Sequence, residues 1–417
     1  MRILFIVEHF PCLSETFVLN QVTTLLDLGH DVWIFPLGRP SGSVVHPDVA
    51  RYNLLARTIP NVPVPASKLR RTLQILSWVP FLTRKTGLKW LRGLNPFQYG
   101  WPAAKLVLLY PACALLKANH RFDHIQCHFG DKGICAVALR AMGALSGAVS
   151  VVFHAHELCR LSDHGGTRKF RVLFRERVLL LPISHYWRER LLRWGASPDH
   201  IAVHRMGVDL ARFDYRPKPI DPSGPVRVLG VGRLVGQKGF EYAIQAVASL
   251  IRDSGWDLRL DIVGSGPLES RLRQQIADLG VERHVSLLGA KTQADVQRMM
   301  RECHVFLLPS VTDENGFQEG IPVALMEAMA CGVPVVSSRH TGIPELVEHG
   351  VSGYLAGERD VAEIANCLKE VIGNAARTRE IVANARGRIG REYDIQLLMR
   401  QWLQLVGDRP AQAAFRS

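Results

Sequence analysis

The chain has 417 residues, which exceeds what one hydrophobic core usually organises and favours two large domains. Apolar residues make up 47% of it and charged residues 21%, so global disorder is excluded. The formal charge of +13 is compatible with an anionic partner, such as a phosphorylated ligand or an anionic membrane surface. Without a C-x-x-C pair, a secretory pattern or a run of 18 apolar residues, we expect a soluble cytoplasmic protein.

The first half of the chain alternates short apolar runs with longer amphipathic stretches. The apolar runs cover residues 3–7, 32–36, 124–127, 150–153, 178–183 and 201–203. This rhythm is typical of parallel strands that are joined by helical crossovers. We therefore predict a first Rossmann-like domain over residues 1–205.

A basic segment over residues 68–92 interrupts this pattern. It combines seven Lys and Arg residues with Trp78, Phe81 and Trp90. Aromatic rings favour the headgroup level of a bilayer, and each cation gains about 1 kcal/mol near an anionic surface. The segment therefore predicts a peripheral membrane contact, although a solvated helical face over buried tryptophans explains it equally well. Nucleic acid is disfavoured because no motif that reads DNA or RNA accompanies the charge.

Histidines stand at two expected strand ends of the first domain. His128 closes one strand, and His154 follows another, together with His156 and Glu157. The H-x-H spacing offers only two metal ligands, which make no site, and the chain has no D-x-D motif. We therefore predict hydrogen-bonding roles for these histidines and no bound metal.

A linker and a second domain follow. Residues 206–225 are rich in proline and polar side chains towards their end, which is typical of a linker. A second alternation of strands and helices over residues 226–385 predicts another doubly wound domain, and a helical segment at 386–417 is expected to pack back on the first. Two such α/β domains would face each other across a cleft, which is the default ligand site.

The first strand of the second domain runs into a cationic turn that carries Gly232, Arg233 and Lys238. A glycine allows close backbone approach, while the planar guanidinium and the compact ammonium both suit a pyrophosphate. The spacing is not that of a Walker loop, and no G-x-G-x-x-G follows the first strand of the chain, so a nicotinamide cofactor is disfavoured. A cationic surface turn without a ligand is the alternative.

Two further strand ends carry glycine. Gly264 and Gly266 precede Pro267, where a helix is expected to begin, and Gly289 follows the next strand. These turns allow a nucleotide to lie close to the backbone, and exposed groups near Gly289 are suited to reading a base edge. Ordinary turns explain the same residues.

Glu319 and Glu327 flank the expected start of another helix. Ile321-Pro322 is predicted to open this helix and Cys331-Gly332 to end it. Free amides and the positive end of the helix dipole favour a phosphate or an electron-poor sugar, and carboxylates bind diols. The pair therefore predicts a phosphorylated sugar donor.

These residues resemble the family 4 glycosyltransferases of GT-B fold, which transfer a sugar from a nucleoside diphosphate with retention of anomeric configuration. The resemblance covers nearly the whole chain. Its motifs are E-x(7)-E at 319–327, G-R-x(4)-K at 232–238, V-G-x-G-P at 263–267 and G-V-D-x-x-x-F at 207–213. Within the family, the runs 11–17, 181–184 and 319–330 are most similar to exopolysaccharide glycosyltransferases of the colanic acid and amylovoran type.

The resemblance implies roles at the donor. Arg233 and Lys238 would neutralise the departing diphosphate, and Glu327 would hold the ribose hydroxyls. Glu319 would hold the transferred sugar, assisted by the amides of Gly320 and Ile321. The glycine turns would complete the donor site. An arginine and a lysine would make a metal ion unnecessary, and no cofactor is expected besides the sugar-nucleotide substrate.

It also implies roles for residues of the first domain, with His154 as a catalytic residue and the others at the acceptor. His154 would lie beside the donor sugar and diphosphate. The loop 8–17 lacks the glycine pair that many relatives carry and has Ser14 and Glu15 instead. Glu15 would bind or deprotonate the acceptor hydroxyl or cap the next helix, Ser14 is expected to cap it, and His128 is a lower-ranked acceptor contact.

The predicted function is a retaining, metal-independent hexosyltransferase. The donor is a nucleoside-diphosphate sugar, with UDP favoured over GDP, and the acceptor is a lipid-linked oligosaccharide of bacterial exopolysaccharide synthesis at the inner membrane. One alternative is a transferase that acts on a soluble small molecule. Another is a sugar-nucleotide-binding protein without catalysis, against which the joint presence of Arg233, Lys238, Glu319 and Glu327 argues.

Overall fold

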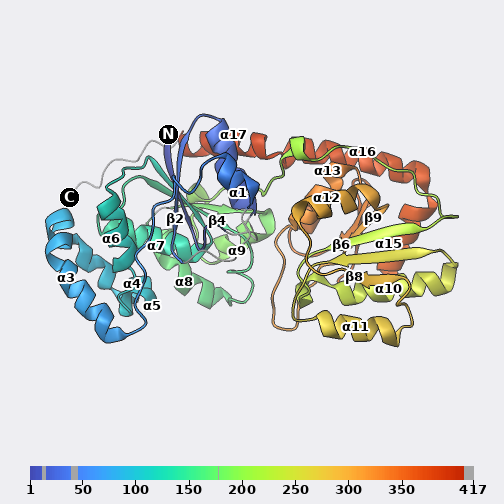
Figure 1. Ribbon diagram of the computed structural model, residues 1–417, viewed down its shortest axis with the longest axis horizontal. Coiled ribbons are helices and arrows are strands. Elements are labelled where there is room, and N and C mark those ends of the chain that lie inside the picture. Colours follow the sequence, from blue (N-terminus) through green and yellow to red (C-terminus); the bar gives the residue numbers. More distant parts are fainter. Residues whose placement is uncertain (12–15, 39–45, 177, 408–417) are drawn as a thin grey trace. The chain divides into compact units, whose positions relative to one another are not determined.

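The computed structural model describes residues 1–11, 16–38, 46–176 and 178–407. The chain forms two compact units, each with its own sheet and helices (Figure 1). Unit 1 comprises Met1–Ile183, Arg188–His204 and the chain from Met399, and unit 2 comprises Ser184–Trp187 and Arg205–Leu398.

Unit 1 is built on a parallel five-stranded sheet in the order β2-β1-β3-β4-β5. Its strands are β1 (Arg2–Val7), β2 (Asp31–Pro36), β3 (His124–His128), β4 (Ala148–Phe153) and β5 (Leu179–Pro182). Nearly every strand residue is buried, because helices cover both faces of a sheet of this type. The order reverses between β1 and β3, so the loops after these two strands meet at the switch point where α/β sheets bind ligands.

The strand predictions for this unit are confirmed with one exception. The expected strand at 201–203 is a single bridge between Ile201 and Leu180. The helices of the unit are α1 (Thr16–Asp27), α2 (Pro47–Arg51), α3 (Lys68–Thr86), α4 (Pro96–Tyr99), α5 (Trp101–Ala104), α6 (Leu109–Ala118), α7 (Gly130–Ala141), α8 (Asp163–Arg175) and α9 (His185–Arg193).

A helical insertion between β2 and β3 contains the basic segment. Ser67 caps α3 through its side chain, and the 3-10 helix η1 (Gly87–Leu94) follows directly. Trp78 packs edge-on against Tyr110 of α6, and the indole of Trp90 donates to Thr83 over 3.2 Å. Within this insertion, α3 packs against α6, while η1 and α4 pack against α7 (Figure 1).

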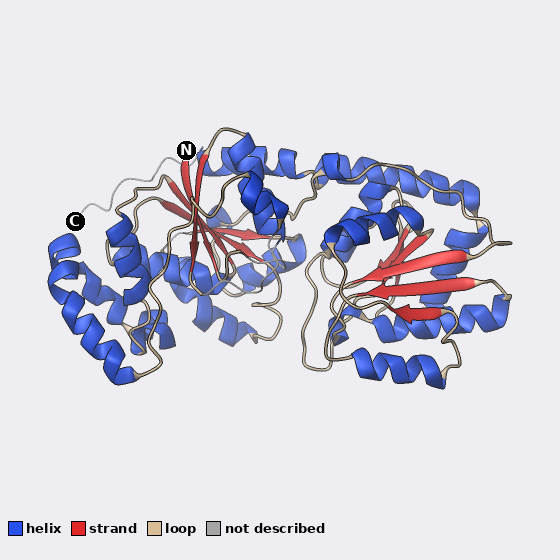
Figure 2. Ribbon diagram, viewed as in Figure 1, coloured by secondary structure: helices blue, strands red, loops and turns tan. Residues whose placement is uncertain are grey.

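Unit 2 contains a parallel six-stranded sheet in the order β11-β10-β9-β6-β7-β8, which Figure 2 shows in red. Its strands are β6 (Val226–Val231), β7 (Leu258–Val263), β8 (Val285–Leu287), β9 (Val305–Leu308), β10 (Val335–Ser338) and β11 (Tyr354–Ala356). The order reverses between β6 and β9, which places the cationic turn after β6 next to the loop after β9. The amide of Val311 donates to the carbonyl of Gln237 there, over 3.0 Å.

Helices cover both faces of this second sheet. α10 (Phe240–Ser254), α11 (Glu269–Asp278) and α15 (Val361–Gly373) lie on one face, and α12 (Gln293–Glu302) and α13 (Val323–Cys331) lie on the other. The short α14 (Ile343–Leu346) follows β10. This doubly wound arrangement is the fold class that the sequence predicts.

The chain ends in α16 (Ala375–Glu392) and α17 (Ile395–Gly407). Within unit 1, Trp402 of α17 is buried, donates to the side chain of Gln126 over 3.2 Å and packs edge-on against His124. The predicted linker, residues 206–225, contains the 3-10 helix η3 (Leu210–Arg212) and a single bridge between Val208 and Asp394.

Candidate functional site

The glycine turns of unit 2 stack against one another at the carboxyl ends of β6, β7 and β8. The amide of Gly232 donates to Val263, and the amide of Gly264 donates to Gly289, each over 3.0 Å. Gly264 has φ +145°, and a Cβ at this position would come within 1.8 Å of the Gly232 carbonyl oxygen. A Cβ at Gly266 would lie 2.5 Å from the carbonyl oxygen of Leu234. At Gly264 and Gly266, glycine is therefore required by backbone packing alone.

Lys238 and Glu319 are brought together from distant parts of the sequence. Lys238 ends the short 3-10 helix η4 (Gly236–Lys238) after β6, and Glu319 lies in the loop after β9. The Lys238 Nζ and a Glu319 carboxylate oxygen are 3.0 Å apart, and both side chains are largely buried. An ammonium is a suitable partner for a phosphate, and a carboxylate for sugar hydroxyls. Both groups thus lie together at the switch point of the sheet.

The loop that leads into α13 presents unused backbone donors. The amides of Gly320 and Ile321 donate to no acceptor among the residues that the structure describes. Helix α13 begins at Val323, with Pro322 as its N-cap residue, so the expectation that Ile321-Pro322 opens the helix is corrected. Proline takes an extended conformation here (ψ 122°), and this leaves Gly320 and Ile321 in the loop.

Glu327 lies on α13 and is half-buried. Burial raises its pKa to about 7, because a carboxylate loses the solvation that stabilises its charge. Its carboxylate forms no hydrogen bond or ion pair within the described parts of the chain. A carboxylate in this state gains from a ligand that brings hydroxyl donors.

Arg233 is exposed beside this loop system. Its guanidinium makes neither a hydrogen bond nor an ion pair to any residue in the described ranges. Because no carboxylate of the described chain pairs with it, the guanidinium is available to bind an anionic ligand.

Sequence reasoning missed three residues that hold this loop. The Glu319 amide donates to Nε2 of His340 over 3.1 Å, and Nδ1 of His340 lies 2.6 Å from a Glu358 oxygen. The Thr341 hydroxyl donates to the carbonyl oxygens of Glu319 and Gly320. His340 and Thr341 follow β10 at its carboxyl end, and this position is the signal that would have identified them.

In unit 1, His154 and His128 form a hydrogen-bonded pair at the ends of β4 and β3. The His154 Nε2 and the His128 Nδ1 are 2.9 Å apart, and the His128 Nε2 lies 3.1 Å from the side-chain oxygen of Gln21 on α1. His128 is fully buried, and the rings of Phe17 and Phe129 pack against His154. Because protein covers His128 completely, it has no free surface for an acceptor.

This chain of contacts fixes where the protons lie. The Gln21 oxygen only accepts, so His128 carries its proton on Nε2 and accepts through Nδ1. His154 then donates through Nε2 and leaves its Nδ1 as a hydrogen-bond acceptor. Burial lowers the pKa of His154 to about 3 and that of His128 well below its usual value, so both rings are neutral at physiological pH.

Glu157 supports the backbone of this strand end. One carboxylate oxygen accepts from the His154 amide over 3.1 Å, and the other is buried without a partner in the part of the chain that the structure describes. Burial raises the pKa of Glu157 to about 7. The neighbouring His156 is exposed. Of the predicted acceptor residues, Ser14 and Glu15 lie outside the described residues.

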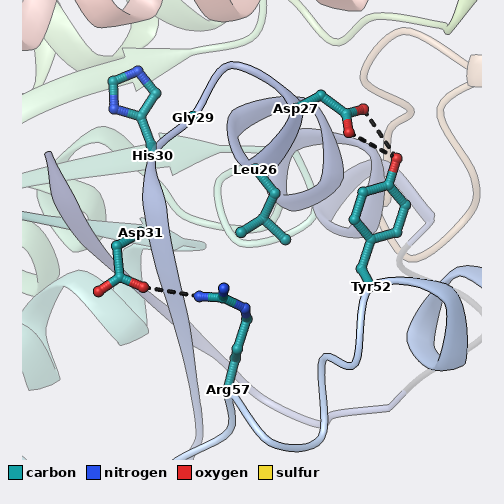
Figure 3. A pocket seen from close by; sticks show the side chains of 7 residues that line it. All are labelled: Leu26, Asp27, Gly29, His30, Asp31, Tyr52 and Arg57. Carbon is teal, nitrogen blue, oxygen red and sulfur yellow. Dashed lines mark hydrogen bonds and ion pairs between the residues drawn. The ribbon is translucent and has the colours of Figure 1, made fainter.

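A surface pocket of unit 1 lies where β2 begins (Figure 3). Tyr52 donates to Asp27 over 3.0 Å, and Arg57 pairs with Asp31 over 2.8 Å. Since ligands of α/β sheets bind at the carboxyl ends of strands and these polar groups pair with one another, we assign no substrate to this pocket. Among the described residues, no group of three or more His, Cys, Asp or Glu is placed to hold a metal ion. Metal independence stays a prediction.

Comparisons with known proteins address the family directly. The family described as glycosyl transferases group 1 matches residues 211–388. Over 97% of its length, the chain is 37% identical to the amylovoran biosynthesis glycosyltransferase AmsK of Erwinia amylovora and covers 99% of that protein. It is 38% identical, with the same coverage, to the colanic acid biosynthesis glycosyltransferase WcaL of Escherichia coli K12. The chain belongs to the group 1 glycosyltransferase family. The predicted resemblance is thereby confirmed.

Solved structures with this architecture confirm the fold of this glycosyltransferase. Anabaena HepE in complex with UDP and glucose matches with a TM-score of 0.71 at 19% identity and covers 98% of this chain and 100% of its own. Sucrose-phosphate synthase from Thermosynechococcus elongatus gives a TM-score of 0.67 at 19% identity, with 98% of each chain covered. The glycosyltransferase therefore has the GT-B fold, with two Rossmann-like units.

Proposed function

We propose that this glycosyltransferase transfers a hexose from a nucleoside-diphosphate sugar in bacterial exopolysaccharide synthesis, as a retaining, metal-independent member of family 4. The observation that carries the proposal is the placement of Lys238 beside Glu319 and the unused amides of Gly320 and Ile321. These groups meet at the switch point between β6 and β9, where ligands of doubly wound sheets bind.

The cations would act on the diphosphate. Arg233 has no carboxylate partner in the described chain, and Lys238 is neutralised only by Glu319. When a diphosphate binds, Lys238 gains a second anion, and Glu319 can accept hydrogen bonds from sugar hydroxyls. Fixed charge on the departing group stabilises the transition state, and one well-placed donor contributes roughly 3 to 4 kcal/mol by analogy with an oxyanion hole.

Glu327 would bind the ribose. Its half-buried carboxylate lacks a protein partner in the described ranges, and two ribose hydroxyls would replace the solvation that it has lost. We favour UDP over GDP as the carrier. HepE, a neighbour in fold, is in complex with UDP, but at 19% identity this likeness does not extend to the ligand.

His154 would accept a hydrogen bond from a substrate hydroxyl. Its Nε2 proton is directed at His128, so Nδ1 is the nitrogen left for a ligand. A neutral acceptor of this kind suits a sugar hydroxyl better than a diphosphate oxygen, because both the nitrogen and the phosphate oxygen only accept. This refines the expected role of His154 and makes His128 a support for it.

The acceptor would be a lipid-linked saccharide. AmsK is named for amylovoran biosynthesis and WcaL for colanic acid biosynthesis, and both are matched along nearly their whole length. An acceptor that is anchored in a bilayer favours an enzyme that can reach the bilayer surface. No helix in the described ranges has the length and apolar character needed to cross a membrane.

The helical insertion of unit 1, between β2 and β3, offers a surface for that contact. This surface includes the segment 68–92, for which the sequence predicts a membrane contact. Between residues 49 and 122 the chain has twelve Lys and Arg residues and no Asp or Glu. Large apolar side chains on this insertion are exposed: Leu69, Leu73, Leu76, Leu88, Phe97 and Trp101. Phe97 is wholly exposed and Trp101 is 75% exposed. Exposed apolar side chains among cations, in a stretch without acidic residues, fit the headgroup region of an anionic bilayer.

A soluble acceptor is the second candidate. The chain is 28% identical over 61% of its length to the D-inositol 3-phosphate glycosyltransferase of Pseudarthrobacter chlorophenolicus, whose name indicates a soluble acceptor. That likeness is shorter and weaker than the likeness to AmsK.

A transfer assay tests the proposed function. Purified protein is incubated with labelled UDP-hexoses or GDP-hexoses and with lipid-linked saccharides extracted from an exopolysaccharide-producing bacterium. We expect label in the lipid fraction with one donor, and transfer roughly 100- to 1000-fold slower with the Lys238→Ala variant. Transfer to soluble inositol or sugar alcohols alone would favour the second candidate, and the absence of transfer to any acceptor would contradict the proposal.

A further inference from the structure

Two side chains after β10 hold the loop that bears Glu319 and Gly320. The Nε2 of His340 accepts from the Glu319 amide over 3.1 Å. The hydroxyl of Thr341 is shared between the carbonyl oxygens of Glu319 and Gly320, at 2.8 and 3.2 Å. Three backbone groups of this loop therefore have side-chain partners, while the amides of Gly320 and Ile321 donate to no described residue.

The proton of His340 is fixed by its partners. Because Nε2 accepts from an amide, a neutral ring carries its proton on Nδ1 and donates it to Glu358, 2.6 Å away. The other oxygen of Glu358 accepts from the Thr312 amide over 2.7 Å. Burial acts to raise the pKa of Glu358, but the hydrogen bonds from His340 and Thr312 hold it below its ordinary value. Glu358 is therefore ionised at neutral pH and serves only as an acceptor.

Thr341 is held in a conformation that its side chain disfavours. Its φ is +44°, a region that is rare for residues other than glycine and a genuine outlier for a β-branched one. Such strain persists only where the surroundings impose it, and it gathers at functional sites. Here it accompanies the two contacts of the Thr341 hydroxyl with the loop.

We propose that Glu358 and Thr341 are positioning residues of the donor site. Glu358 acts through His340 and fixes the Glu319 amide, and Thr341 fixes the next two carbonyl groups. Together they set the peptide planes so that the amides of Gly320 and Ile321 stay available to the sugar nucleotide. This inference rests on the proposed function, since it assumes that these amides meet the donor.

Glu358→Gln is a sharp test because the two oxygens of Glu358 both accept. A glutamine of the same shape has one oxygen and one NH2 group, so it cannot accept from both His340 and Thr312. Either orientation of the amide places two donors against each other. Glu363→Gln is the matched control, since Glu363 also accepts from a side chain, Arg339, and from a backbone amide, Gly357, without contacting the loop.

Thr341→Val provides a second test that changes no charge. Valine keeps the β-branched shape and the same backbone strain but lacks the hydroxyl. Thr341→Ser is its control, because serine retains the hydroxyl. If Glu358→Gln does not fold, as judged by circular dichroism, the threonine pair still decides the question.

The measurement is the affinity of each variant for UDP and UDP-glucose, and for GDP and GDP-mannose, by titration calorimetry. We expect Glu358→Gln and Thr341→Val to weaken binding of the preferred sugar nucleotide about tenfold, while binding of the bare nucleoside diphosphate changes less than threefold. The controls should match the wild type. In the wild type, imidazole 15N NMR should place the His340 proton on Nδ1.

Two failures can be told apart. If the wild type binds its sugar nucleotide but Glu358→Gln and Thr341→Val bind it as tightly as their controls do, the positioning inference is overturned and the donor site stands. If the wild type binds none of the four ligands, the proposed function fails and this inference fails with it.

Discussion

The carboxyl edges of the two sheets differ in how far their polar groups are satisfied. In unit 2, Arg233 and the Glu327 carboxylate lack partners in the described parts of the chain, as do the amides of Gly320 and Ile321. In unit 1, Gln21, His128 and His154 satisfy one another in a buried chain of hydrogen bonds. The edge in unit 2 therefore leaves polar groups available to a ligand, as the proposed donor site requires, whereas the edge in unit 1 presents one oriented neutral nitrogen to its surroundings.

Removing a cation from the carboxyl edge of the unit 2 sheet should have the largest effect of all, a decrease in the rate of sugar transfer. We expect Lys238→Ala to lower kcat about 100- to 1000-fold, because one positioned charge on the leaving group is lost. Lys369→Ala, which removes an exposed lysine from α15, should keep the wild-type rate. Steady-state transfer rates check this. Equal rates for the two variants would show that Lys238 does not act on the diphosphate.

The helical insertion should lose membrane affinity when its apolar side chains are replaced. We expect Leu73→Ser combined with Phe97→Ser to weaken binding to anionic vesicles at least tenfold, since burial of one such side chain contributes about 1.5 to 3 kcal/mol. Leu279→Ser is the control, because Leu279 is 40% exposed and lies on unit 2. Vesicle sedimentation measures the difference. Unchanged binding of the double variant would rule out insertion of these side chains.

The edge in unit 2 should respond to pH through Glu327. Burial raises its pKa to about 7, so the carboxylate is increasingly protonated below pH 7 and accepts less well from ribose hydroxyls. We expect nucleotide affinity to fall by up to about fivefold from pH 7 to pH 6, as the ionised fraction of a group with a pKa of about 7 does. The affinity of the Glu327→Gln variant should lack this part of the pH dependence but keep the part that comes from protonation of the nucleotide's phosphate. Identical pH profiles for the wild type and Glu327→Gln would exclude the ribose contact.

Titration of the buried histidines at the edge in unit 1 should have the smallest effect, and this effect is on the stability of the fold. Burial lowers the pKa of His154 to about 3, below its value in the unfolded chain, so the unfolded chain binds more protons between these values. The free energy of unfolding should therefore decrease as the pH falls from 6.5 towards 3, by about 1 to 2 kcal/mol per histidine by pH 5. His154→Gln keeps a donor for His128 but cannot titrate, and urea unfolding should show a weaker pH dependence for it. An unchanged dependence would contradict the buried neutral ring.

Much of the fold could be predicted from the sequence because each strand is a short apolar run bounded by turn residues. The sequence predicts a strand at residues 201–203, whereas the structure has a single bridge at Ile201. An apolar run does not reveal whether the neighbouring strand pairs with all of its residues or with one. The start of α13 was placed too early, because proline suits both the N-cap and the first helical turn.

The candidate site was predictable only where motifs carry it. Arg233, Lys238 and Glu327 could be named from strand-end chemistry and the resemblance. The contact between Lys238 and Glu319 is tertiary, so spacing along the chain could not give its distance. His340 and Thr341 were missed for the same reason, because their role depends on a neighbouring strand end rather than on their own segment.

The most direct test of the donor site in unit 2 is a thermal-shift panel with UDP, GDP, ADP, dTDP and NAD. A ligand at 100 times its dissociation constant adds about 2.7 kcal/mol to the stability of the folded state. We predict stabilisation by one nucleoside diphosphate, UDP in the first place, that disappears in Arg233→Ala and in Glu327→Ala. No stabilisation of the folded wild type by any nucleoside diphosphate, or stabilisation that survives both substitutions, would contradict the account.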